Sequence, residues 1–208
     1  MFKTLSSFLS SGPSWAYRRI WLDALVGACA ITALASMISY ILGSSTNVFF
    51  SENGTHEMSQ SLVLGIAAAA GVLGMLRRPD LNGYAAFATA VVSYVGFFRE
   101  MPSCYGDVTN FCESPDVRSS FMVVGGLVFL LGSFIVALRH HQLILSALRP
   151  RFSWPLALAA SGIVASQISE EFGQVAIEEM LELYSYTLLM FGAGWLAFRA
   201  PSPALARD

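Results

Sequence analysis

Six runs of mostly apolar residues, separated by short polar stretches, dominate the pattern of this chain. They predict helices at about residues 20–43, 59–76, 81–98, 120–138, 153–171 and 174–198. About 20 helical residues cross the hydrocarbon core of a bilayer, so the runs have the lengths of membrane spans, although the second and the fifth are short. We therefore predict an all-α fold: a polytopic bundle of six transmembrane helices, in a single domain that covers residues 1–208.

The composition agrees with a membrane protein. Hydrophobic residues make up 55% of the chain and charged residues only 12%, and the mean hydropathy is +0.58. These values are too apolar for an ordinary soluble domain, so the lipid bilayer is the expected surrounding. The twelve basic residues are dispersed in ones and twos, which argues against a nucleic-acid-binding surface.

The distribution of positive charge predicts the orientation. In a six-helix topology ten of the twelve basic residues fall on one side of the membrane, and only Arg99 and Arg118 fall on the other. Because cytoplasmic loops are enriched in Lys and Arg, both termini should be cytoplasmic, including an N-terminal segment at residues 1–19. Most acidic residues then collect on the outer side.

Two proline-containing stretches predict helix starts on the cytoplasmic side. Pro79 should end the second helix and Asp80 should cap the third, which makes these two helices antiparallel neighbours. Ser153 followed by Pro155 is typical of a cap with proline in the first turn, and predicts that the fifth helix begins at Ser153.

The densest group of acidic residues lies between Ser166 and Tyr186, where the fifth helix should turn into the sixth at Gly173. Glu178 and Glu182 are four residues apart and share one helix face, while Glu179 lies about 100° away on a stripe that includes Tyr186. No Lys or Arg occurs between Trp154 and Phe198. Carboxylates so crowded must be partly protonated or must hold a cation, unless they are simply a solvated helix end.

These carboxylates predict an ion site on the outer side. The third helix ends there with Arg99 and Glu100, and oxygen ligands suit Mg, Mn or Ca. We predict that the metal ligands are Glu100, Glu171, Glu178 and Glu182, although the same groups can instead share protons. The predicted counter-ion or substrate contacts are Arg99, Gln167, Glu170, Gln174, Glu179 and Tyr186.

Two short motifs carry a family resemblance. Arg99 and Glu100 form an RE pair at the end of one helix, and residues 178–182 read EEMLE at the start of another. This combination resembles a group of uncharacterised small multi-pass bacterial inner-membrane proteins. The resemblance implies a bacterial inner (plasma) membrane and a paired use of the two motifs, and it supplies no activity.

Several functions are compatible with this pattern. An enzyme acting on a lipid-like substrate would use the cation to polarise a phosphate. The alternatives are a non-catalytic subunit of a membrane assembly, with a protein partner or a second copy of the chain, and a small proton- or cation-coupled transporter. The sequence contains no GxSxG, HExxH or P-loop motif. Since His56 is expected outside and His140 and His141 inside, a three-histidine zinc site is also excluded.

Cys104 and Cys112 lie in the outer loop after the third helix, whereas Cys29 lies within the first helix. Two cysteines eight residues apart on the oxidising side of a membrane predict a disulfide; the alternative is two free thiols.

Overall fold

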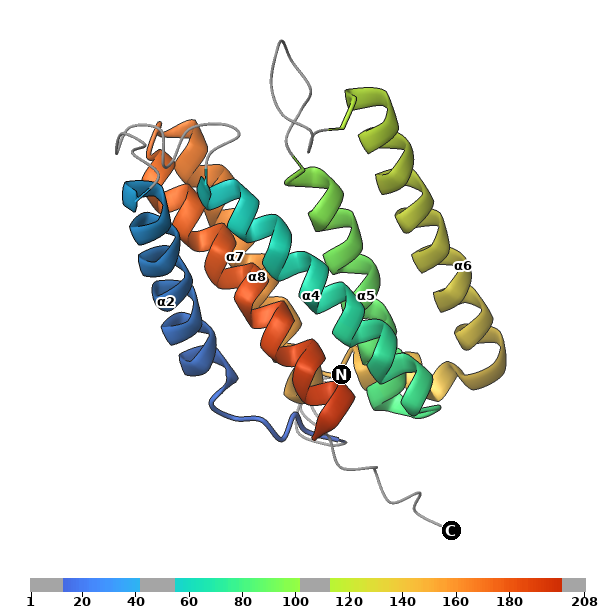
Figure 1. Cartoon of the computed structure of the whole chain (residues 1–208). Helices are drawn as coiled ribbons and strands as arrows, with labels where there is room; N and C mark the ends of the chain where they lie inside the picture. The colour runs from blue at the N-terminus through green and yellow to red at the C-terminus, as the bar shows by residue number, and fades with distance from the viewer. Residues whose placement is uncertain (1–12, 42–54, 102–112, 200–208) are drawn as a thin grey trace.

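The computed structural model describes residues 13–41, 55–101 and 113–199, and within these ranges it is a bundle of six α-helices (Figure 1). The predicted all-α class is therefore confirmed. The helices are α2 (Ile20–Ile41), α4 (Thr55–Arg77), α5 (Leu81–Arg99), α6 (Pro115–Ala147), α7 (Pro150–Glu171) and α8 (Val175–Phe198).

Helix α8 is the centre of the bundle. It packs against α2, α4, α5 and α7, and most of its residues from Glu182 to Ala197 are buried. Small residues on α8 such as Gly192 and Ala193 let neighbouring helices approach, while Leu183, Leu188 and Leu196 fill the space between them. The polar beginning of α8 is therefore held in place by the same contacts that form the core.

Helices α4 and α5 form the tightest pair, and they run antiparallel as the sequence predicts (Figure 1). The Asp80 carboxylate caps α5 by accepting hydrogen bonds from the backbone N–H groups of Asn82 and Gly83, at 2.9 and 3.1 Å. A Cβ atom on Gly71 would stand 2.8 Å from the backbone of the facing helix at Ala86 and Ala90. This close approach fixes how the end of α5 lies beside the beginning of α4.

Helix α6 is much longer than the predicted span at 120–138. Ser114 caps its first turn by accepting from the Val117 N–H at 3.4 Å, and Pro115 occupies a first-turn position that needs no backbone donor. The helix is interrupted at His140, whose φ of −145° and ψ of 57° are not helical. The predicted apolar run therefore covers only the middle of α6: the helix begins earlier because Ser114 caps its polar first turn, and it continues past the polar residues 139–142 to Ala147.

The predicted start of α7 at Ser153 is wrong. The helix begins at Pro150 with Arg149 at the N-cap position, and Pro155 lies inside the helix. Both prolines fit a first turn by sequence, and Pro150 is the one that occupies it. The turn from α7 to α8 lies where it was predicted: Gly173 has a φ of +67°, a left-handed conformation that glycine adopts without strain.

The two ends of the described chain meet at one end of the bundle. The indole of Trp15, just before α2, lies 4.9 Å from that of Trp195 near the end of α8. The backbone N–H of Trp15 also donates to the backbone carbonyl of Arg151 at 2.9 Å. An even number of helices between the two tryptophans explains this arrangement. Most of the predicted segment 1–19 lies outside the described residues.

Four of the described helices are long and apolar enough to cross a membrane: α2, α4, α5 and α6. Helix α4 has 23 residues, so the prediction of a short second helix is wrong. Large apolar side chains cover the outside of the bundle, and Gly125 alone is buried in α6. An apolar surface of this extent is compatible with contact to a lipid bilayer.

Candidate functional site

The polar site lies at the end of the bundle opposite Trp15 and Trp195. There the end of α5, the beginnings of α4 and α8 and the end of α7 come together (Figure 1). Charged residues at this end are far apart in the sequence, and the antiparallel packing of the helices brings them to one place. We call the group formed by Arg99, Glu100, Ser166, Glu182 and Tyr186 the arginine site.

Arg99 connects two carboxylates in the arginine site. Its Nη2 donates to Glu182 Oε1 at 2.7 Å, and its Nε lies 3.4 Å from Glu100 Oε1. The Ser166 hydroxyl of α7 also donates to Glu182 Oε1, at 3.1 Å. The Glu182 residue is only 3% exposed. A carboxylate this deeply buried needs a charged partner, and Arg99 supplies it.

Glu100 is the second buried carboxylate of the site, at 6% exposure. The Tyr186 hydroxyl donates to its Oε1 at 2.7 Å, and the Ser61 hydroxyl donates to its backbone carbonyl at 2.7 Å. Burial, followed by the nearby negative charge of Glu182, raises the pKa of Glu100 from 4.5 to about 7. Glu100 can therefore change its charge near neutral pH.

A second hydrogen-bonded group surrounds Glu179 on the adjacent stripe of α8. His56 Nδ1 lies 3.0 Å from Glu179 Oε2, and Gln60 Nε2 donates to the same oxygen at 2.7 Å. His56 and Gln60 come from the first turns of α4 and are fully buried. Since Glu179 and Glu182 are three residues apart on α8, the two groups occupy adjoining positions at the same end of the bundle.

The predicted ligands are only partly brought together. Glu100 and Glu182 meet on Arg99, whereas Glu178 is partly exposed and Glu171 is exposed at the end of α7. Within the described ranges, no three His, Cys, Asp or Glu side chains come close enough to hold a metal ion. Metal binding stays a prediction.

The predicted contact residues divide in the same way. Tyr186 and Arg99 belong to the arginine site and Glu179 to the second group. Glu170, Gln167 and Gln174 are exposed. Gln174 acts instead through its backbone carbonyl, which accepts from the N–H groups of Ile177 and Glu178 at 3.0 Å. Gln167, Glu170 and Gln174 are exposed because they lie near the turn at Gly173, at the end of the α7–α8 pair.

His56, Gln60 and Ser61 are parts of the site that the sequence pattern did not predict. His56 and Gln60 are four residues apart and therefore share a helix face, but residues 55–58 precede the predicted apolar run, so hydropathy does not predict a helix there. The signal that was available is this polar pair at helical spacing directly before an apolar helix. Cys104 and Cys112 lie outside the described residues, so the disulfide stays a prediction.

Comparisons with protein-family models, with curated proteins and with solved structures find no match for this chain. The proposed function is therefore based on the geometry of the site.

Proposed function

We propose that this protein is an integral membrane protein of the bacterial inner membrane, with six spans and both termini in the cytoplasm. The ten-to-two distribution of basic residues supports this orientation. The contact of Trp15 with Trp195 supports the location of both termini on the same side, because it brings the beginning of α2 and the end of α8 to one end of the bundle. In this topology the arginine site lies at the outer face.

We further propose that the arginine site binds and releases one ion as part of a coupled membrane function, and that the ion is a proton. The proposal rests on the balance of charges among the buried side chains of the arginine site. Glu100 and Glu182 carry two negative charges when ionised, and Arg99 supplies one positive charge. The site then has one uncompensated negative charge, which is costly in low dielectric until a cation neutralises it.

The hydrogen bonds indicate where the proton goes. Glu182 accepts from both Arg99 and Ser166, and these two donors favour its ionised form. The Tyr186 hydroxyl favours the ionised form of Glu100 in the same way, but Arg99 lies 3.4 Å from Glu100 and only 2.7 Å from Glu182, so Glu100 is the better site for the proton. A site that takes up a proton near pH 7 suits a proton-coupled transporter, and it also suits an enzyme that needs a general acid.

The divalent-cation prediction gives a different result from the proton proposal in one experiment. Thermal unfolding of the purified protein in detergent, at pH 8, is compared with and without Mg²⁺, Mn²⁺ or Ca²⁺. A proton site gives no increase in melting temperature with any of the three ions, but an increase on acidification toward pH 6. A rise with one divalent ion that is lost in both Glu100→Gln and Glu182→Gln, and kept in the exposed control Asp116→Asn, would replace the proton with that metal.

A further inference from the structure

The end of the bundle opposite the arginine site carries a concentrated positive charge. The beginnings of α2 and α7 and the end of α8 meet there (Figure 1). The described segments 13–23, 149–152 and 195–199 contain five arginines and one aspartate, which is a net charge of +4. We call the group formed by Trp15, Arg18, Arg19, Arg151 and Arg199 the basic cluster. All four of its arginines are exposed.

The charge of the basic cluster is not neutralised by the nearby aspartate. The Asp23 carboxylate accepts a hydrogen bond from the Tyr17 hydroxyl at 2.5 Å. Among the described residues, no carboxylate forms an ion pair with Arg18, Arg19 or Arg199. The cluster therefore presents several guanidinium groups to its surroundings, and these groups bind phosphate and carboxylate oxygens well.

Two further features at this end favour an anion. Helix α7 begins without a side-chain cap at Arg149, so the positive end of its dipole adds to the charge of the arginines. The indole N–H of Trp15 has no acceptor among the described residues, although Trp15 is only 5% exposed. Trp15 packs against the first turn of α7, where its ring lies 5.5 Å from that of Phe152. A buried donor without an acceptor is costly, so this end of the bundle lacks an acceptor group.

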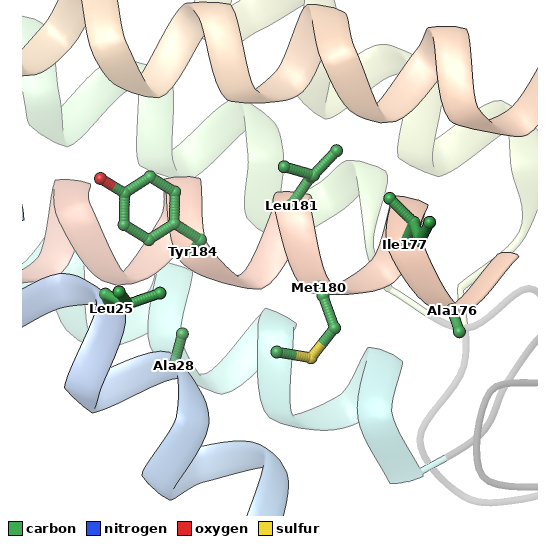
Figure 2. A pocket seen from close by; sticks show the side chains of 7 residues that line it. All are labelled: Leu25, Ala28, Ala176, Ile177, Met180, Leu181 and Tyr184. Carbon is green, nitrogen blue, oxygen red and sulfur yellow. The ribbon is translucent and has the colours of Figure 1, made fainter. Parts of the chain in front are cut away.

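The adjoining apolar surface indicates that the anion belongs to a lipid. On α2, directly after Arg19, the side chains of Trp21, Leu22 and Leu25 are 47%, 40% and 45% exposed. Leu25 also lines an apolar groove between α2 and α8 (Figure 2). The basic cluster thus lies at the end of a helix surface suited to hydrocarbon. Its aromatic residues are of the kind that marks the boundary between hydrocarbon and headgroups.

We propose that the basic cluster binds the headgroup phosphate of an anionic phospholipid such as phosphatidylglycerol. The guanidinium groups pair with the phosphate oxygens, and the acyl chains lie along the exposed apolar side of α2. Phosphatidylethanolamine also carries an amine, which the net positive charge repels. The inference rests on the proposed membrane location but not on the proposed ion binding, because the arginine site lies at the opposite end of the bundle.

Native mass spectrometry of the full chain, purified in detergent, tests the assignment. The protein is loaded with an equimolar mixture of phosphatidylglycerol and phosphatidylethanolamine that have identical acyl chains, and is then delipidated stepwise. We expect phosphatidylglycerol to be retained in preference. Arg18→Gln or Arg199→Gln should each lower this preference about fivefold. Trp15→Phe, which keeps an aromatic ring and removes the indole N–H, should lower it as well.

The control is Arg139→Gln, which removes the same charge from an exposed arginine of α6 outside the basic cluster and should leave the preference unchanged. Equal retention of the two lipids by the wild type would overturn the inference. So would an equal loss of preference in Arg139→Gln and Arg199→Gln, because the charge of the whole molecule would then explain the binding. A rise in melting temperature with inorganic phosphate as large as that with phosphatidylglycerol would assign the cluster to free phosphate. A chain that stays soluble without detergent would instead contradict the membrane location itself.

Discussion

Replacing Glu100 by Gln should make the protein more stable at pH 8 and leave its stability nearly unchanged at pH 5. Burial raises the pKa of Glu100 from 4.5 to about 7. A carboxyl group whose pKa is raised in the folded state contributes stability below pH 4.5, and this contribution is lost as the pH rises to about 7. Gln does not ionise, and its amide oxygen can still accept the hydrogen bond from Tyr186.

The expected size of this difference in stability follows from the raised pKa of Glu100. A difference of about 2.5 pKa units corresponds to about 3 kcal/mol of unfolding free energy at 1.36 kcal/mol per unit. For a chain of this length, 1 kcal/mol moves the melting temperature by roughly 2–4 °C. The Glu100→Gln variant should therefore melt roughly 6–12 °C above the wild type at pH 8, and the difference should disappear toward pH 5.

The assay is thermal unfolding in one detergent, from pH 5 to pH 8, for the wild type, Glu100→Gln and the control Glu171→Gln. Glu171 is an exposed glutamate at the end of α7, so its replacement should leave the pH profile parallel to that of the wild type. If Glu100→Gln also runs parallel to the wild type across this range, Glu100 does not change its charge in the folded protein. The reasoning from burial would then be refuted.

Further predictions concern the other parts of the account. Arg99→Gln should lower the unfolding free energy by about 2 kcal/mol at pH 8, less than for a fully buried pair because the Arg99 side chain is 40% exposed. Denaturation in detergent measures this change, and Arg139→Gln, at an exposed arginine of α6, is the control; a loss equal to that of the control would contradict the role of Arg99. Cys104 and Cys112 should resist alkylation until the protein is reduced, and their disulfide should contribute about 2–3 kcal/mol; modification of both thiols without reductant would exclude it. Reporter fusions after Arg78, Arg149 and Asp208 should signal from the cytoplasm and those after Asn53 and Asp107 from outside, and an outside signal at Arg78 would contradict six spans.

Much of the fold could be predicted because the apolar runs and the caps are local signals. Asp80 caps α5 through the N–H groups of Asn82 and Gly83, the second and third residues after it, and Gly173 permits the turn between α7 and α8 by itself. The ends of α6 could not be predicted from hydropathy, since its first turn is polar and the polar residues 139–142 interrupt the apolar run before its last turn. The choice between Pro150 and Pro155 also depends on packing that the local sequence does not contain.

The part of the site that could be predicted is the pairing of a buried carboxylate with a basic residue. Glu182 shares its helix face with no basic residue, and Arg99 is one of only two basic residues expected on that side, so their pairing follows from topology. The roles of Ser166 and His56 depend on the rotation of α7 and α4 about their axes, which the sequence does not give. Helical spacing predicts Glu178 on the same face as Glu182, and Glu171 lies just across the turn at Gly173. Glu182 is buried, whereas Glu178 is partly exposed and Glu171 is exposed, so only Glu182 belongs to the site.

Infrared difference spectroscopy of the purified protein tests the central claim most directly, because it detects the protonated carboxyl group itself. Between pH 5 and pH 8 the account predicts one buried carboxyl band that disappears with a midpoint near pH 7. The band should be absent in Glu100→Gln and retained in Glu171→Gln. A spectrum without such a band, or with one that survives in Glu100→Gln, would contradict the claim that the arginine site holds its proton on Glu100.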